Sequence, residues 1–270
     1  VTPEGEYVKS KEKTDSRLHY ATMMFTRGWM ISWASNYLAR ACTIATRYSL
    51  VRAQGFNDPA QNQTYLAGEN KIIDYQIQRY RLFKQLSVCY AIKFVARWMV
   101  GQFSLLSGKS KSKSSYVIQD TTHLKEIAAT VAGLKALSTY WTANGIEDLR
   151  RCCGGNGYLL SSGIAALSAD YVWQLTAEGD WIILILLTAR FLLKTLNEAK
   201  KGKLNLSSDS PCDYLAPLQD PKFNILSAAP KPPKKASDFS NIDYLLEYFK
   251  FRALVCLASV GKDFQNMVQG

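Results

Sequence analysis

The chain has 270 residues, with 33 Lys and Arg against 22 Asp and Glu, so its formal net charge is +11. Apolar residues make up 47% and charged residues 20%, which excludes a disordered tail, a collagen and a disulfide-bonded miniprotein. A chain of this length can bury a sizeable core in one or two domains. Six scattered cysteines without CxxC spacing indicate reduced thiols and no zinc site.

The basic charge does not point to nucleic acid. The lysines cluster mainly in two loop-like stretches, 109–113 and 231–235, with few aromatic residues between them and no recognised nucleic-acid motif. An anionic small ligand or a solvated surface explains the charge equally well. The strongest apolar run, Trp181–Leu187, is soon followed by Arg190 and Lys194, so it is too short for the ~18–20 residues of a membrane span. We expect a buried helix there, no membrane span and no nucleic-acid partner.

Apolar residues recur every three or four positions along most of the chain, as in amphipathic helices. The pattern predicts helices over about 18–52, 70–107, 115–152, 162–169, 180–200 and 238–268. The apolar face of the second comprises Ile73, Ile77, Tyr80, Phe83, Leu86, Tyr90, Phe94, Val95 and Trp98. No segment is typical of a strand. The predicted fold is therefore all-α, an antiparallel bundle of four long helices with a further helix appended.

Composition also suggests the domain limits. Residues 1–17 are a polar lead-in, and the helical bundle is expected over 18–200. Six of the eight prolines fall in 201–236, with much Ser and Lys, which predicts a linker. Residues 237–270 would begin a second helical domain.

Two carboxylates, Glu178 and Asp180, precede the most apolar helix. Asp180 can serve as its N-cap. Glu178 is flanked in sequence by Trp173, Trp181 and Ile182, which would partly desolvate it, as suits a proton-abstracting base. The alternative is that both carboxylates only complement the dipole of the helix.

Three glycines, Gly154, Gly155 and Gly157, fall within four residues after the third predicted helix. Such a turn lets backbone N–H groups approach a partner closely. It can cradle a phosphate, or it can simply be the C-cap of the helix. It is not a dinucleotide fingerprint, because no strand precedes it. The two histidines, His19 and His123, show no metal-ligand spacing, and we expect no metal site.

Several segments, in the correct order over about residues 20–200, resemble the acyl-CoA oxidase family. They are Ala41–Arg52, Asp74–Phe83, Gly133–Ser138 with Gly145–Glu147, Cys153–Tyr158, and Glu178–Asp180 with Thr188–Lys194. Residues 238–256 look like the start of the family's final helical domain.

The resemblance implies an enzyme that uses FAD to oxidise acyl-CoA to trans-2-enoyl-CoA and passes the electrons to oxygen, giving hydrogen peroxide. It implies that Glu178 is the base and that Arg27 lies near the CoA part of the substrate. The residues it assigns to the flavin are Arg52 and Gln76, reaching the flavin of a neighbouring subunit, Gly154, Gly155 and Gly157 at its diphosphate, and Asp180. The resemblance further implies a homodimer or larger assembly and a peroxisomal location.

The family also carries an N-terminal helical domain and a β-domain that supplies most of the flavin site. We therefore expect this chain alone to bind FAD weakly. Trp181 and Leu187 stand where the family usually has Asn and Gln, and Ala53 where Arg often follows Arg52. These departures favour a second hypothesis, a non-catalytic structural or assembly subunit of a larger complex. A dehydrogenase that passes electrons to a carrier protein is a third.

Overall fold

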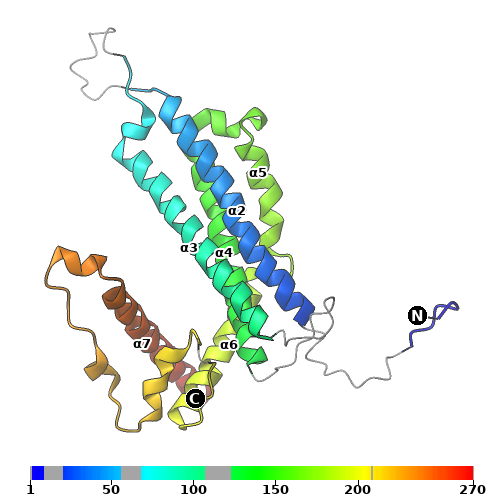
Figure 1. Ribbon diagram of the computed structural model, residues 1–270, viewed down its shortest axis with the longest axis vertical. Helices are drawn as coiled ribbons and strands as arrows, with labels where there is room; N and C mark the ends of the chain where they lie inside the picture. The colour runs from blue at the N-terminus through cyan, green and yellow to red at the C-terminus, as the bar shows by residue number, and fades with distance from the viewer. Residues whose placement is uncertain (1, 9–20, 56–67, 107–122, 208, 270) are drawn as a thin grey trace. The chain divides into compact units, whose positions relative to one another are not determined.

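The computed structural model describes residues 2–8, 21–55, 68–106, 123–207 and 209–269 (Figure 1). They belong to two compact units, of which the first comprises Val1–Thr121 with Leu134–Ile182 and the second Thr122–Gly133 with Ile183–Gly270. The lysine-rich stretch 109–113 lies outside the described residues.

The helices of the structure are α2 (Ala21–Val51), α3 (Gln76–Leu106), α4 (Leu124–Cys152), α5 (Ile164–Tyr171), α6 (Trp181–Lys200) and α7 (Ile242–Gln269). Each corresponds to a helix predicted from apolar spacing. The described residues contain no strand, only an isolated antiparallel bridge between Ala53 and Lys71. The all-α prediction is therefore confirmed, while the domain limits stay predictions.

In the first unit α2, α3 and most of α4 lie side by side, and α5 packs on α2 (Figure 1). The approach of α4 to α2 is close: a Cβ added at Gly145 would lie 3.0 Å from Leu38 Cδ1, and Thr142 Oγ1 donates to the carbonyl of Ala34 at 3.4 Å. Small residues on both helices make this approach possible.

Most of the apolar face predicted for α3 is exposed rather than buried, although Ile73, Val95 and Trp98 are half-buried. Ile77, Phe83 and Phe94 are 67%, 62% and 63% exposed. The buried face instead carries Leu82, Gln85, Cys89, Ile92, Ala96 and Met99. Both faces satisfy helical spacing, so periodicity alone could not tell which one meets α2 and α4.

The second unit has its own core. Leu196 and Ala199 of α6 pack with Leu254 and Leu257 of α7. The segment 201–236, predicted as a linker, contributes Cys212 and Leu215 to this core through the short 3-10 helix Asp213–Gln219. Thr188 Oγ1 donates to the Ala129 carbonyl at 3.0 Å and so joins α6 to the start of α4.

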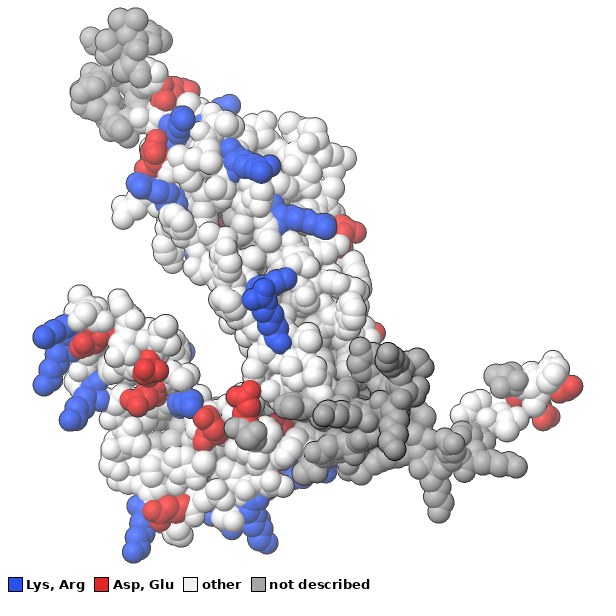
Figure 2. Space-filling view, in the orientation of Figure 1, with Lys and Arg blue, Asp and Glu red and all other residues white. Residues whose placement is uncertain are grey.

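The charged side chains and the cysteines can be located in the structure. On the face drawn in Figure 2, Lys and Arg side chains are spaced along the helices instead of forming one continuous patch.

All six cysteines are free thiols and five of them are buried. Burial raises the pKa of the Cys42 thiol to about 12, which makes it unreactive near neutrality. Among the described helices, none combines the length and the apolar character needed to span a membrane.

Candidate functional site

The loop that carries Glu178 runs from the 3-10 helix Val172–Leu175 to the start of α6. Glu178 has φ 58, and Gly179 after it has φ 114. Within the described residues Glu178 is the one non-glycine residue with positive φ. A left-handed backbone costs an ordinary residue about 1–2 kcal/mol, so it persists only where the surroundings enforce it.

Two buried cations hold the backbone of the loop in this conformation. Arg27 of α2 is 4% exposed, and its Nε donates to the backbone carbonyl of Glu178 at 2.9 Å. Lys135 of α4 is 0% exposed, and its Nζ donates to the carbonyls of Gly179 at 2.8 Å and Leu175 at 3.3 Å. Three carbonyl oxygens within five residues of the loop are therefore held from two helices. The half-buried Glu178 has its backbone fixed on the side that faces the bundle.

The charges around this loop affect each other. The pKa of Lys135 is lowered to about 8, mainly by desolvation and also by the positive charge of Arg27, while the carboxylates of Asp180 and Glu178 oppose the shift. Two cations and two carboxylates thus lie near one loop. The sequence singled out Glu178, Asp180 and Arg27 but missed Lys135, whose signal was a lysine among the small residues of the buried face of α4.

Asp180 and Trp181 start α6. Asp180 Oδ1 accepts a hydrogen bond from the Ile182 N–H at 2.9 Å, so its predicted role as N-cap is confirmed. The Trp181 ring stacks on Tyr140, with centroids 4.5 Å apart and planes at 23°. Trp173 and Ile182 are 50% and 53% exposed, so within the described residues the apolar enclosure expected around Glu178 is incomplete.

The other predicted flavin residues gather at the far end of the first unit. Arg52 follows α2, and its carbonyl accepts from the Ile72 N–H at 2.9 Å, just ahead of α3. Gln76 is the first residue of α3, and both Arg52 and Gln76 are exposed.

The glycine turn after α4 lies at this same end. Asn156 Nδ2 donates to the Tyr48 hydroxyl at 2.8 Å, and Gln78 Nε2 donates to the Cys152 carbonyl at 2.9 Å. Figure 1 shows the turn beside the end of α2. The structure therefore brings Arg52, Gln76 and the glycines together.

The three glycines have different structural surroundings. A Cβ at Gly157 would lie 2.1 Å from the Arg150 carbonyl oxygen, so this glycine is required by packing within the chain. A Cβ at Gly154 or Gly155 would meet nothing within 4 Å. Gly154 has φ 55, as a helix C-cap does. The open space fits the close approach of a diphosphate, so the C-cap and the phosphate interpretations are compatible here.

The two groups of predicted site residues are far apart within one chain. Arg27 and Arg52 stand near opposite ends of the single helix α2, which at 1.5 Å per residue separates their backbones by roughly 37 Å. Glu178 and Asp180 lie with Arg27, whereas Gln76 and the glycine turn lie with Arg52. One chain cannot bring both groups to the same reacting atoms.

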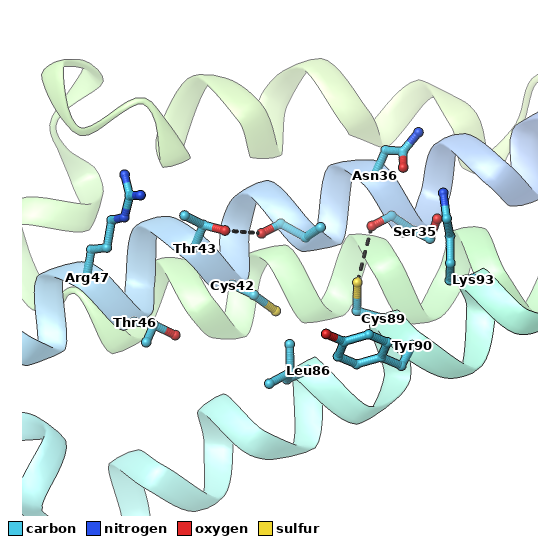
Figure 3. Close-up of a pocket in the computed structure, with 11 residues that line it drawn as sticks. Ser35, Asn36, Cys42, Thr43, Thr46, Arg47, Leu86, Cys89, Tyr90 and Lys93 are labelled. Carbon is cyan, nitrogen blue, oxygen red and sulfur yellow. Dashed lines mark hydrogen bonds between the residues drawn. The ribbon is translucent and has the colours of Figure 1, made fainter.

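A groove of about 520 Å³ lies between α2 and α3 (Figure 3). Arg47 and Lys93 flank it, and the Cys89 thiol on its floor donates to the Ser35 carbonyl at 3.3 Å. No predicted site residue lines this groove. Within the described part of the chain, no cluster of His, Cys, Asp or Glu suited to a metal ion occurs.

Comparison with known proteins agrees with this architecture. The profile of the family described as "Acyl-CoA oxidase, C-alpha1 domain" matches residues 20–193. Peroxisomal acyl-coenzyme A oxidase 1 of Arabidopsis thaliana is 39% identical over 100% of this chain and 38% of its own length. The rat protein of the same name is 36% identical over 99% of this chain and 38% of its own length.

Solved structures give the same result. Acyl-CoA oxidase 1 of Arabidopsis thaliana superposes with a TM-score of 0.79 at 37% identity, covering 98% of this chain and 37% of that one. Acyl-CoA oxidase-1 of Caenorhabditis elegans, complexed with FAD and ATP, superposes with a TM-score of 0.73 at 26% identity. The match covers 100% of this chain and 36% of that one. The chain thus spans about two fifths of the length of these relatives. It belongs to the acyl-CoA oxidase family.

Proposed function

We propose that the chain is the C-terminal helical part of a flavin-dependent acyl-CoA oxidase, with Glu178 as the base that removes the α-proton of the acyl thioester. The observation that carries the proposal is the loop itself. A carboxylate-bearing residue is held in a left-handed conformation by two buried cations, at the position that the family resemblance gives to the base. Strain enforced in this way is typical of functional sites.

The residues of this loop have separate tasks. The α-proton of a thioester is weakly acidic, so its base must be aimed at the α-carbon and shielded from water. Glu178 takes the proton, while Arg27 holds the carbonyl of the same residue. Asp180 starts α6 and so fixes where the loop ends. Bound FAD would supply the acceptor for the hydride of the β-carbon and the route by which electrons reach oxygen, giving hydrogen peroxide.

We also propose that the residues at the other end of the bundle contact a flavin; they are Arg52, Gln76, Gly154 and Gly155. The exposed Arg52 and Gln76 and the open space over the glycines fit a dinucleotide at this end. Because this end lies roughly 37 Å from the Glu178 loop along α2, we propose that it serves the flavin of a neighbouring subunit in a homodimer or larger assembly. Asp180 would then contact the flavin of its own subunit.

Two further assignments belong to this proposal. Arg27 donates to the Glu178 carbonyl through Nε and to Met23 Sδ through a terminal nitrogen, and we propose that it also lies near the CoA part of the substrate. The peroxisome is the proposed location, since the relatives are named as peroxisomal oxidases.

The second candidate function is a non-catalytic assembly subunit, and Trp181 is the observation that favours it. A large indole stands where the family usually has a small amide. Its stacking on Tyr140, however, shows that the bundle accommodates the ring. This packing weighs against a ring that blocks the flavin, and the oxidase proposal remains the better supported.

The test compares Glu178→Gln with Glu198→Gln in the flavin-loaded full-length enzyme. Glu198 on α6 is half-buried, with a side chain that is 44% exposed, and it pairs loosely with Lys194 at 3.8 Å, so its variant controls for loss of a carboxylate. Glu178→Gln should lower acyl-CoA-dependent peroxide release by at least about 10²-fold, the usual contribution of a general base, with the melting temperature and flavin content unchanged. Wild-type turnover in Glu178→Gln would remove Glu178 as the base.

A further inference from the structure

Lys135 is a lysine in a position that a helical bundle ordinarily fills with an apolar side chain. It is 0% exposed and shares a face of α4 with Ala132 and Thr139, which are equally buried. A buried ammonium is unfavourable without hydrogen-bond acceptors. The acceptors here are the carbonyl oxygens of Leu175 and Gly179, at 3.3 and 2.8 Å from Nζ.

These two carbonyls lie on either side of Glu178 in the sequence. Leu175 ends a 3-10 helix, and Gly179 directly follows Glu178. Because one ammonium holds both carbonyls, the segment between them cannot extend without losing a hydrogen bond. Glu178 adopts φ 58 within this segment, a conformation that its own side chain disfavours.

Packing alone does not explain the lysine. A methionine of similar length would fill the same space without desolvating a charge. The ammonium is faced by the cation of Arg27 from α2 and by the carboxylates of Glu178 and Asp180 from the loop. What the lysine adds over an apolar residue is a set of N–H donors directed at the loop.

We propose that Lys135 is a positioning residue for proton abstraction: by holding the Leu175 and Gly179 carbonyls, it fixes the backbone at Glu178 and thereby the direction of the carboxylate. The inference rests on the proposed function, because it takes Glu178 as the base. Lys135 acts through Glu178 and needs no contact with acyl-CoA. A misdirected base slows the chemical step while substrate binding is kept, since misplacement by about 1 Å can cost about 10²-fold in rate.

The test uses Lys135→Met, Lys135→Gln and Thr139→Val in the flavin-loaded full-length enzyme. Thr139→Val is the matched control, since its hydroxyl is equally buried on α4 but bonds the Lys135 carbonyl of its own helix. The measurements are kcat, KM, the kinetic isotope effect with acyl-CoA deuterated at the α-carbon, and hydrogen exchange of amides 176–180.

Lys135→Met should lower kcat by about 10- to 100-fold with KM nearly unchanged. It should also increase the isotope effect and speed exchange in the loop, whereas Thr139→Val should change none of these. Lys135→Gln keeps an N–H donor and should recover part of kcat. If Lys135→Met does not fold, Lys135→Gln decides: slower turnover with faster loop exchange supports the proposal, and wild-type values for both overturn it.

Failure of this inference differs from failure of the proposed function. Full activity in Lys135→Met, beside an inactive Glu178→Gln, overturns the role of Lys135 and leaves the base in place. Full activity in Glu178→Gln removes the base and the positioning role with it, whatever the loop exchange shows.

Discussion

The Nε–H of Arg27 donates to the backbone carbonyl of Glu178 across 2.9 Å, joining residues 151 positions apart in the chain. The start of α2 therefore fixes the backbone of the proposed base. α2 ends at Val51, directly before Arg52, at the other end of the unit, where the predicted flavin contacts lie. The length of α2 thus sets the distance between the two groups of predicted site residues, which is why we propose that a neighbouring subunit completes each site.

Glu178→Gly should stabilise the folded protein while removing the proposed base. Glycine adopts positive φ without the clash that glutamate suffers, although it loses more backbone freedom on folding. We expect the free energy of unfolding, measured in urea, to rise by up to about 1 kcal/mol. Ala177→Gly is the control, because Ala177 has no positive φ, and it should lower the same quantity by about 0.5–1 kcal/mol. Equal destabilisation by both changes would show that the left-handed conformation carries no strain.

The buried ammonium of Lys135 should make stability depend on pH. Its pKa is about 8 in the folded chain against the ordinary 10.5, so between these values the unfolded chain binds more protons. Stability from this group therefore rises with pH through this window, and it is lost as pH falls through 8. Relative to Lys135→Met, the wild-type free energy of unfolding should increase by about 2 kcal/mol between pH 7 and 9.5. The comparison cancels other groups that titrate in both proteins, and a difference independent of pH would refute the lowered pKa.

The helices could be predicted from sequence because apolar spacing is a local property. The predicted limits 18–52 and 180–200 differ by only a few residues from α2 and α6. Which face of a helix is buried is not local. The stripe of α3 containing Ile77, Phe83 and Phe94 is as regular as the buried one, and only the packing of α2 and α4 decides between them.

Candidate site residues could be predicted where they stand in a short sequence motif. They could not be predicted where their role depends on contacts between distant parts of the chain. Glu178 and the glycines stand in short segments that resemble the family. The role of Lys135 depends on contacts with residues 40 and 44 positions away, which no spacing rule reveals. Gly157 likewise serves packing against the Arg150 carbonyl, although in sequence it resembles its neighbours.

Trp181→Asn tests whether the indole matters to the flavin or only to the bundle. Losing the stacked contact with Tyr140 should lower the free energy of unfolding by about 1 kcal/mol. FAD affinity and kcat of the full-length enzyme should stay at wild-type values. A Tyr140→Leu variant, which removes the other ring, should lose a similar amount, and the double variant should lose less than the sum. A gain of FAD affinity in Trp181→Asn would instead favour the assembly-subunit hypothesis.

The glycine turn allows its packing and ligand roles to be separated by two alanine substitutions. Gly157→Ala forces a Cβ to within 2.1 Å of the Arg150 carbonyl oxygen, and relief requires the backbone itself to move. We expect a loss of about 1–3 kcal/mol in the free energy of unfolding. Gly155→Ala meets open space, so its stability should change by less than about 0.5 kcal/mol. If a flavin diphosphate approaches this backbone, Gly155→Ala must still weaken FAD binding to the full-length apoenzyme by about tenfold, or about 1.4 kcal/mol. Flavin fluorescence titration measures this directly, and unchanged affinity would reduce the turn to a helix cap.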